Sequence, residues 1–335
     1  ALKVTEGRKD DIRQCVAANH CWKSVSKGMR VQCVYNPTVG REAHWGKRAA
    51  LQTEAPKRII VLGGGPAGLE FARVAAARGH AVTLHERSAE LGGHVRLQSK
   101  LPKREKLGEI GRWLASQVAK AGVEVHTGDE VTPARLAEIC AAHRADHVVV
   151  ATGSRVCRDG FQGWTGAPLP GADRGTCYGW DQVLEGEVEV AGDVLVIDDQ
   201  ADVVGPLISV YAAEHGARSV RLATRWPMVG METIGDAYFE WIMPQVYQSG
   251  VQLFVDHFVR SIGQSSAELF NIYAEERAVE VPADTVVMVT ARQSENALAA
   301  AARELGLSCE VIGDAVAPRG TYEAVYEGHR HARAV

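Results

Sequence analysis

Three glycines in the spacing GxGxxG follow an apolar run at residues 58–62, and they are Gly63, Gly65 and Gly68. The run predicts a strand and residues 66–78 have helical periodicity, so the glycines join a strand to a helix. There Gly63 allows a tight turn, Gly65 lets the backbone approach a pyrophosphate, and Gly68 lets helix and strand pack closely. The helix start offers free amides and a partial positive charge to phosphates. The spacing therefore predicts a site for an adenine dinucleotide or a bare adenine nucleotide.

A carboxylate follows at the distance expected of a residue that holds ribose hydroxyls. Glu86 comes directly after a second predicted strand, at residues 81–85, and a carboxylate there accepts hydrogen bonds from the ribose. The competing interpretation is a glycine-rich turn that binds nothing. Because the strand, the helix and the acid all stand at the expected positions, the sequence favours nucleotide binding.

Three further turns of small residues stand downstream. A glycine pair follows the acid, a Thr-Gly pair ends a strand, and a Gly-Asp pair closes a late strand. In this order they are typical of a flavoprotein with two dinucleotide folds, in which the late aspartate reaches the ribityl chain or the pyrophosphate of FAD. The residues predicted to contact FAD, or ADP in its place, are Gly63, Gly65, Pro66, Ala67, Gly68, Glu86, Arg87, Gly92, Gly93, His94, Thr152, Gly153, Gly313 and Asp314.

The second predicted strand-turn-helix unit lacks the glycines that a nicotinamide nucleotide needs. Its turn follows the apolar run at residues 194–197 and contains Asp198, Asp199 and Asp202. Three carboxylates would repel a pyrophosphate, and the turn lacks the backbone room that glycine gives. The sequence therefore predicts no NAD(P)H site here, and we interpret this fold as a structural relic.

Three cysteines crowd the first tenth of the chain, whereas the other four are scattered and predicted to be reduced, structural thiols. The three are Cys15, Cys21 and Cys33. Thiolates are the ligands that iron–sulfur clusters need, so the group predicts a cluster site. A four-thiolate site would have a further cysteine where this chain has Ala18. A nitrogen ligand from His20 or His44, a three-iron cluster, no cluster, and three buried free thiols are alternatives that the sequence leaves open.

Composition excludes several classes of function. The chain has 335 residues, of which 46% are hydrophobic and 23% charged, enough for two globular α/β domains. Its formal net charge is −4 and its basic residues are dispersed, so no nucleic-acid partner is expected. The longest apolar runs are strand-sized and the first residues lack a signal peptide's apolar core, so we expect no membrane span and a cytoplasmic location.

The order of the predicted elements indicates an α/β fold with two nested Rossmann-like domains of the glutathione reductase type. Residues 1–55 form an irregular, Cys-containing segment that tertiary contacts or a metal must order. Residues 56–155 and 285–335 form the FAD- or ADP-binding domain, and residues 185–284 form the degenerate NAD(P)-like domain. A stretch rich in Pro and Gly, residues 160–175, marks a crossing between the domains.

From end to end, the chain resembles the C-terminal half of trimethylamine dehydrogenase and its relatives, which include histamine dehydrogenase, 2,4-dienoyl-CoA reductase and N-demethylases. Besides the glycine turn, the segments that carry the resemblance are residues 11–15, 33–42, 91–94, 170–173, 289–295, 312–319 and 326–330. In that family an N-terminal (β/α)8 barrel carries FMN and the substrate site, a four-cysteine 4Fe–4S cluster follows, and two dinucleotide folds complete the chain. This sequence begins where such a barrel would end, so we expect the barrel in a separate subunit or outside this piece.

Members of the family differ in how electrons enter and leave. Reductases use FAD and NADPH, whereas trimethylamine dehydrogenase keeps only ADP in the first fold and passes electrons to an electron-transferring flavoprotein. The degenerate turn at residues 198–205 is similar to the dehydrogenase side of that divide. Ala18 departs from the family's four-thiolate pattern.

The resemblance implies the electron-transfer and nucleotide-binding part of an amine dehydrogenase that performs oxidative N-demethylation. Its expected partners are the FMN barrel and an acceptor like electron-transferring flavoprotein, within an oligomer. The alternatives are an NADPH-fed reductase portion and a noncatalytic scaffold that holds ADP. No catalytic acid, base or nucleophile is predicted in this chain, because the residues that would contact the substrate lie outside it.

Overall fold

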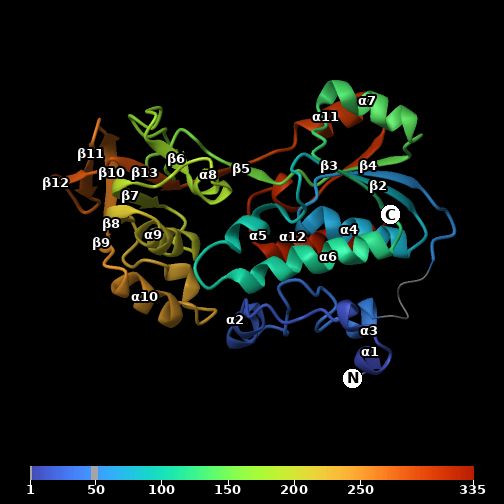
Figure 1. The fold of residues 1–335 in the computed structure, drawn as a ribbon. Coiled ribbons are helices and arrows are strands. Elements are labelled where there is room, and N and C mark those ends of the chain that lie inside the picture. Colours follow the sequence, from blue (N-terminus) through green and yellow to red (C-terminus); the bar gives the residue numbers. More distant parts are fainter. Residues whose placement is uncertain (1, 47–51) are drawn as a thin grey trace. The chain divides into compact units, whose positions relative to one another are not determined.

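The computed structural model describes residues 2–46 and 52–335 and consists of two compact units (Figure 1). Unit 1 comprises Ala1–Arg96, Lys106–Arg155 and Ser294–Val335, and unit 2 comprises Leu97–Glu105 and Val156–Gln293. Among the described residues, none of the helices has the length and apolar character needed to cross a membrane.

Unit 1 is built on five parallel strands in the order β15-β4-β1-β2-β3. The strands are β1 (Arg58–Leu62), β2 (Ala81–Glu86), β3 (Glu124–Thr127), β4 (His147–Val150) and β15 (Ser308–Val311). The central β1 is an almost continuous buried apolar run, as expected of a parallel strand covered on both faces.

Alternate side chains of β1 enter two different hydrophobic cores. Ile59 and Val61 share a core with residues of α4, α6 and α12, whereas Ile60 and Leu62 share one with residues of α7 and α11. Figure 1 shows these two groups of helices on opposite faces of the sheet. The helical elements of the unit after residue 57 are α4 (Pro66–Ala77), α5 (Gly93–Gln98), η3 (Glu105–Gly108), α6 (Glu109–Lys120), α7 (Pro133–Ala142), α11 (Ala297–Glu304), η5 (Gly313–Ala315) and α12 (Thr321–Ala332). Two of them, α5 and η3, extend into residues of unit 2.

The N-terminal segment is irregular, with short helical pieces α1 (Leu2–Thr5), η1 (Lys9–Asp11), α2 (His20–Ser26) and α3 (Glu42–Trp45). Contacts with the rest of unit 1 order it. Tyr35 is buried, and its hydroxyl donates to the backbone oxygen of Gln14. The guanidinium of Arg13 lies 3.9 Å from the centroid of the Trp113 ring on α6.

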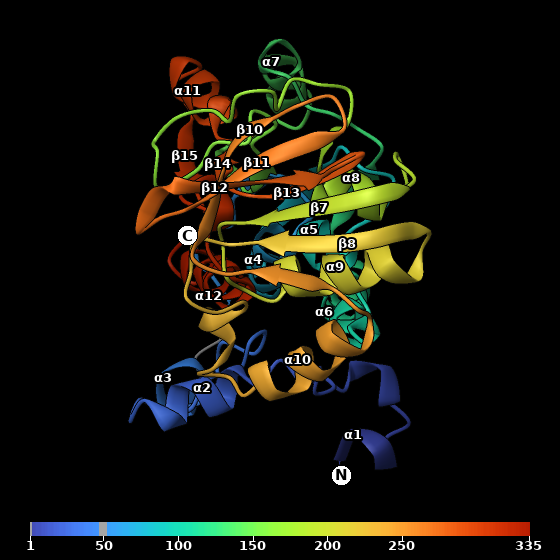
Figure 2. The same cartoon turned by 90° about the vertical axis from the view of Figure 1, so that its left-hand side faces the viewer.

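Unit 2 has a parallel sheet in the order β6-β13-β7-β8-β9 and an antiparallel sheet of β10, β11 and β12 (Figure 2). The parallel strands are β6 (Cys177–Gly179), β7 (Gly192–Asp198), β8 (Ala217–Ala223), β9 (Gln252–Phe254) and β13 (Thr285–Val289). The antiparallel strands are β10 (His257–Ile262), β11 (Ser266–Asn271) and β12 (Ala274–Pro282). The helical elements are α8 (Trp180–Glu185), α9 (Val204–Glu214), η4 (Met231–Thr233) and α10 (Phe239–Gln248). The short strands β5 (Ser154–Val156) and β14 (Arg292–Ser294), which pair with each other, contain two of the points at which the chain passes between the units.

The boundary between the units differs from the predicted one at β13. The sequence assigned residues 285–335 to the first domain, but β13 pairs with β6 and β7 in the sheet of unit 2. Its five residues are all buried, and such a run fits the interior of either parallel sheet. The strands that β13 pairs with show which unit it belongs to, and the local sequence does not encode that pairing.

Candidate functional site

The predicted glycine turn lies between β1 and α4 and is packed as tightly as its spacing requires. Gly63 has a φ of 110°, and a Cβ atom there would overlap the carbonyl oxygen of Ala151. A Cβ atom at Gly68 would overlap the carbonyl oxygen of Gly63. The two glycines therefore serve the turn and the approach of helix to strand.

Gly65, by contrast, faces open space. It is the N-cap of α4, its φ is −76°, and a Cβ atom built on it meets nothing within 4 Å. Pro66 begins the helix, and no side chain caps the amides of the first turn, which includes Ala67. An uncapped helix start with room in front of it is suited to an anionic group such as a pyrophosphate.

Glu86 lies beside this turn at the end of β2. One carboxylate oxygen accepts the Gly64 N–H at 2.6 Å, and the other accepts the Ser88 N–H at 2.8 Å. Each oxygen has a further lone pair, so the carboxylate can also accept hydrogen bonds from ribose hydroxyls. Arg87, the next residue, is exposed.

The glycine pair after the acid packs on the same turn. Gly92 N–H donates to the Gly64 carbonyl oxygen at 2.9 Å, and a Cβ atom at Gly93 would lie 3.3 Å from the Gly65 Cα. Gly93 begins α5, which places His94 in its first turn. The structure therefore brings the two predicted glycine segments together.

The two remaining predicted turns also belong to unit 1. Thr152 and Gly153 follow β4, and the Gly153 carbonyl oxygen accepts the Glu295 N–H at 2.9 Å. A Cβ atom at Gly313 would lie 2.8 Å from the Cβ of Ala67, which places the late Gly-Asp turn against the start of α4. Asp314 accepts the Arg319 N–H at 2.9 Å through Oδ1.

Sequence reasoning missed a carboxylate that supports the late turn. Glu327 on α12 accepts the Gly313 N–H at 2.8 Å and forms an ion pair with Arg319 at 2.8 Å. Burial alone would raise the pKa of Glu327, but Arg319 and the Gly313 N–H hold it below its ordinary value. Its place in the last helix gave no local signal, because only the contact between α12 and α4 brings it here.

The turn of the second Rossmann-like fold is filled by its own side chains. Asp198, at the end of β7, is fully buried, and its Oδ1 accepts the N–H groups of Gln200 and Ala201, both at 3.0 Å. A Cβ atom at Gly205 would overlap this carboxyl group. Burial, together with nearby Asp202, raises the pKa of Asp198 to about 8.

The other two carboxylates of this turn are also engaged. Asp199 forms an ion pair with Arg225, and Asp202 accepts the Val204 N–H at 2.8 Å through Oδ1. The three carboxyl groups thus form hydrogen bonds with backbone N–H groups of their own turn or an ion pair with a neighbouring side chain. Their arrangement leaves the start of α9 without the open, glycine-lined face that α4 presents.

Comparison with known proteins identifies the family. Residues 57–317 match the family described as pyridine nucleotide-disulphide oxidoreductase. The chain belongs to this family. The predicted α/β class with Rossmann-like dinucleotide domains and the expectation of an oxidoreductase are thereby confirmed.

The similar proteins include amine dehydrogenases. This oxidoreductase chain is 31% identical to N,N-dimethylglycine/sarcosine dehydrogenase of Chromohalobacter salexigens, over 98% of this chain and 51% of that protein. It is 28% identical to the solved histamine dehydrogenase of Rhizobium sp. 4-9, with a TM-score of 0.90 over 100% of this chain and 52% of that one. The resemblance to the amine dehydrogenase group is confirmed.

A reductase is also similar. The structure of 2-naphthoyl-CoA reductase in complex with 2-naphthoyl-CoA has a TM-score of 0.86 and 26% identity, over 100% of this chain and 48% of that one. The oxidoreductase chain thus spans about half the length of each of these three proteins.

The predicted metal ligands of this oxidoreductase lie in its N-terminal segment. Cys15 and Cys21 are exposed and Cys33 is half-buried. The Ala17 N–H donates to the Cys15 sulfur at 3.4 Å. Ala18 and Cys33 both pack against the core of unit 1. The three thiols do not form a group close enough for a single ion in the described part of the chain, but a cluster holds its thiolates further apart. The cluster stays a prediction.

The backbone around Ala18 is strained. Ala17 has a φ of 56° and Asn19 a φ of 49°, in the left-handed region that non-glycine residues rarely adopt. Such conformations concentrate at functional loops. Of the alternative nitrogen ligands, His20 stacks on Tyr322, with ring centroids 4.3 Å apart, and its Nε2 lies 3.0 Å from a Gln32 oxygen. His44 is exposed in α3.

Proposed function

We propose that this chain is the electron-transfer and adenine-nucleotide-binding portion of a flavin and iron–sulfur amine dehydrogenase that performs oxidative N-demethylation. The observation that carries the proposal is the contrast between the two Rossmann-like turns. The start of α4 is open and uncapped at Gly65, whereas Asp198 fills the corresponding turn before α9. One nucleotide site, rather than two, is what the dehydrogenase branch of the family requires.

The open turn fits FAD or ADP. Amides around Gly65 and Gly68 would hold the pyrophosphate, Glu86 the adenosine ribose, and Asp314 the ribityl side of FAD. A bound FAD would supply the redox chemistry. The chain's own residues bind and orient the nucleotide.

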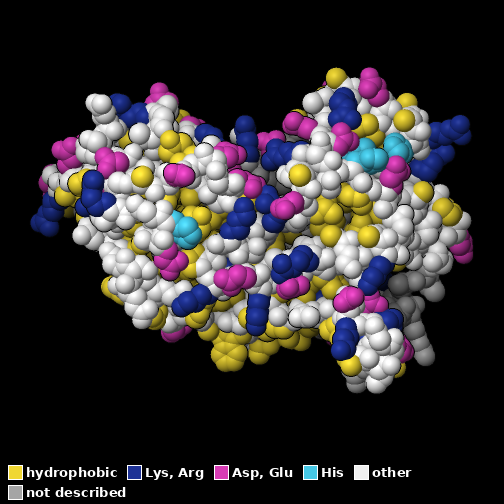
Figure 3. Space-filling view, in the orientation of Figure 1, with side chains coloured by type: hydrophobic (Ala, Val, Ile, Leu, Met, Phe, Trp, Pro, Cys, Tyr) yellow, Lys and Arg dark blue, Asp and Glu magenta, His cyan; other side chains and the backbone are white. Residues whose placement is uncertain are grey.

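The barrel that would carry FMN and the substrate lies outside this chain, whose length is about half that of its relatives. The N-terminal segment has an exposed apolar surface. Trp22, Val25, Met29 and Val31 are all exposed, on α2 and just after it, and Figure 3 shows apolar side chains gathered over this region. We propose that the barrel packs here, beside Cys21, and that electrons leave through this segment to an acceptor such as an electron-transferring flavoprotein.

The nucleotide is tested by acid release and chromatography of the full protein. Recovery of FAD supports electron transfer through the nucleotide, whereas recovery of ADP alone means that the nucleotide itself carries no electrons, as in trimethylamine dehydrogenase or in the scaffold alternative. Gly65→Val should abolish binding, because its side chain would fill the open space without disturbing the fold. Gly175→Val is the matched control, since a Cβ atom there also meets nothing within 4 Å and its φ is not positive. Binding that survives Gly65→Val would contradict the site.

An NADPH-fed reductase is the second candidate, favoured by the similarity to 2-naphthoyl-CoA reductase. Stopped-flow mixing with NADPH separates the two. We expect no rapid bleaching of flavin absorbance, because Asp198, Asp199 and Asp202 fill the second turn. Rapid bleaching would overturn the dehydrogenase assignment. Iron and sulfide analysis of the protein purified with its natural partner tests the cluster.

A further inference from the structure

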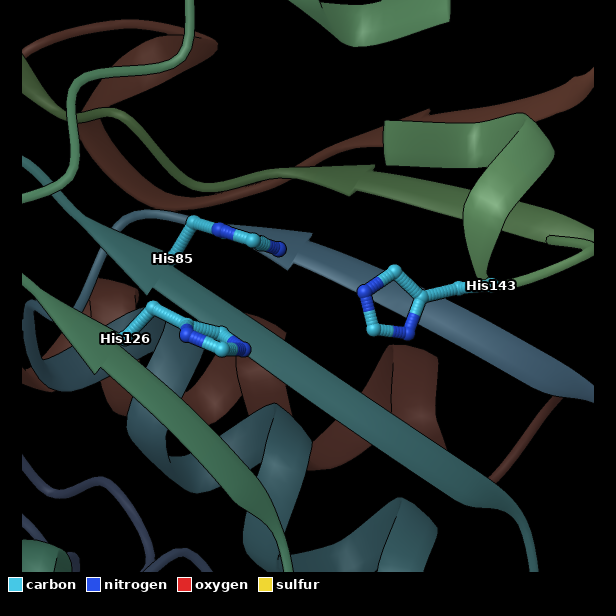
Figure 4. Close-up of side chains that lie close together, drawn as sticks. All are labelled: His85, His126 and His143. Atoms are coloured by element: carbon cyan, nitrogen blue, oxygen red, sulfur yellow. The ribbon is translucent and has the colours of Figure 1, made fainter. Parts of the chain in front are cut away.

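Three histidines from separate elements meet on the α7 side of the sheet in unit 1 (Figure 4). His85 comes from β2, His126 from β3, and His143 directly follows α7. One ring nitrogen from each lies within 4.8 Å of the others. Within the described residues, this is the group of three histidine, cysteine or acidic side chains close enough to share one metal ion.

Strand register places two of these rings together. His85 and His126 are direct partners in the parallel pairing of β2 with β3, so their side chains leave the sheet on the same face. Their rings stack with centroids 4.8 Å apart and an interplanar angle of 14°. The His143 ring approaches both edge-on, with centroids 6.2 Å from His85 and 6.4 Å from His126.

The environment of His85 prepares one nitrogen as a ligand. Its Nδ1 lies 2.7 Å from an Asp129 carboxylate oxygen, which fixes the proton on Nδ1 and leaves the Nε2 lone pair free. The residue is 5% exposed, and Nε2 has no hydrogen-bond partner. A carboxylate that orients a metal-binding histidine through its other ring nitrogen is a common arrangement, and an unpartnered buried nitrogen otherwise carries a cost.

Glu124 lies beside the three histidines. It is the β3 partner of Thr83, one of its carboxylate oxygens lies 3.1 Å from His126 Nε2, and the other lies 3.9 Å from His143 Nδ1. The competing interpretation is a set of surface histidines held by carboxylates alone. That interpretation accounts for His126 and His143 but leaves the buried Nε2 of His85 without a partner.

We propose that His85, His126 and His143, with Glu124 as the fourth ligand, bind a divalent late transition-metal ion, for which Zn²⁺ is the best fit. Three imidazoles and one carboxylate match the borderline-soft, tetrahedral preference of Zn²⁺. Small rotations of the half-exposed rings of His126 and His143 would bring the nitrogens to the usual zinc–nitrogen distance of about 2.0–2.1 Å. The ion would tie β2, β3 and the end of α7 together, next to the predicted ribose ligand Glu86.

Calorimetric titration of the full protein with Zn²⁺ tests the site. We expect a site that binds one Zn²⁺ per chain, weakened at least tenfold by His126→Gln and by His143→Gln. His215→Gln is the control, because His215 is exposed, stacks on Tyr211 and lies outside the group. Circular dichroism without metal checks that the variants are folded. Absence of Zn²⁺ binding, or equal affinity in all four proteins, would overturn the proposal.

X-ray absorption of the zinc-loaded protein distinguishes this site from the exposed thiols. The proposal requires nitrogen and oxygen scatterers at about 2.0–2.1 Å. Scattering dominated by sulfur at about 2.3 Å would place the ion on cysteines such as Cys15 and Cys21, and would overturn it.

Discussion

Single residues decide which of the two dinucleotide folds stays open, and Asp198 is the clearest case. Its carboxyl group is fully buried and its Oδ2 atom has no hydrogen-bond partner. The same group closes the turn by accepting two backbone N–H groups through Oδ1. Burial therefore favours the protonated form of this carboxyl group, and holding that proton in the folded chain lowers the stability of unit 2 at neutral and alkaline pH, where the unfolded chain has released it.

We expect Asp198→Asn to make that stability less dependent on pH. The folded pKa of about 8 lies above the ordinary aspartate value of about 3.9, so between these values the unfolded chain has released a proton that the folded chain keeps. The free energy of unfolding of the natural chain therefore falls as pH rises through this window. The variant keeps Oδ1 as an acceptor and should be more stable at pH 8 by on the order of a few kcal/mol, and nearly unchanged at pH 4.

Urea unfolding at a series of pH values measures this difference. Asp173→Asn is the control, because Asp173 is exposed in the same unit. Parallel pH profiles for Asp198→Asn and the natural chain would show that Asp198 does not hold a proton in the folded state.

Glu86 is the residue that we propose contacts the ribose of the nucleotide. Glu86→Gln keeps an oxygen that can accept the Gly64 N–H but loses the charge that strengthens hydrogen bonds from ribose hydroxyls. Losing a charged hydrogen bond costs about 1.5–3 kcal/mol, so we expect ADP to bind roughly tenfold or more weakly. Calorimetry with ADP measures this. As a control, Glu138→Gln, on the exposed side of α7, should bind ADP as tightly as the natural protein does. If Glu86→Gln also binds ADP as tightly as the natural protein, Glu86 does not contact the ribose.

At the scale of elements, a buried charge cluster fastens the N-terminal segment to unit 1. Glu70 on α4 is fully buried, forms ion pairs with Arg73 at 2.7 Å and Arg13 at 3.7 Å, and shares a hydrogen bond of 2.8 Å with His329. Although burial opposes ionisation, Arg73 and Arg13 hold the pKa of Glu70 below its ordinary value. Arg13 is the member of this cluster that the cysteine-containing segment contributes.

Arg13→Ala should therefore loosen the whole segment. It removes the ion pair with Glu70 and the stacking on Trp113, and we expect a loss of about 2–4 kcal/mol in the free energy of unfolding. The lowered pKa of Glu70 means that its ionised form stabilises the folded chain, and this stabilisation is lost when acid protonates the carboxylate. We therefore expect the less stable variant to unfold at a higher pH than the natural chain as the pH is lowered. Thermal melts and limited proteolysis measure both effects. Arg8→Ala, in an exposed ion pair with Glu6, should behave as the natural chain.

Local patterns predicted the elements better than their assembly. The first strand-turn-helix unit follows from glycine spacing and apolar periodicity, and β1 and α4 lie where these signals put them. The unit that contains β13 was wrongly assigned, because a buried strand carries no mark of its neighbours. The group of His85, His126 and His143 was missed for the same reason, since strand register and a helix end, rather than sequence spacing, bring these side chains together.

At the scale of the whole molecule, the N-terminal segment joins the two roles proposed for the chain. It carries Cys15, Cys21 and Cys33, and it also exposes the apolar surface around Trp22 on which we propose that the barrel packs. A cluster on this segment would lie beside the proposed barrel contact. Ala18, packed against the core between two left-handed residues, is the position where the family's fourth thiolate would stand.

Ala18→Cys is the variant that tests whether the loop still has the geometry of a cluster site. After anaerobic reconstitution of the full protein with iron and sulfide, we expect it to hold more iron per chain than the natural sequence, with the spectrum of a four-thiolate cluster, because position 18 is where a four-thiolate site would have its further cysteine. Adding Cys15→Ser to this variant should remove the gain, whereas adding Cys309→Ser should not, since Cys309 lies on β15 outside the segment. Absence of bound iron from both Ala18→Cys and the natural chain would mean that the three thiols do not form a cluster site.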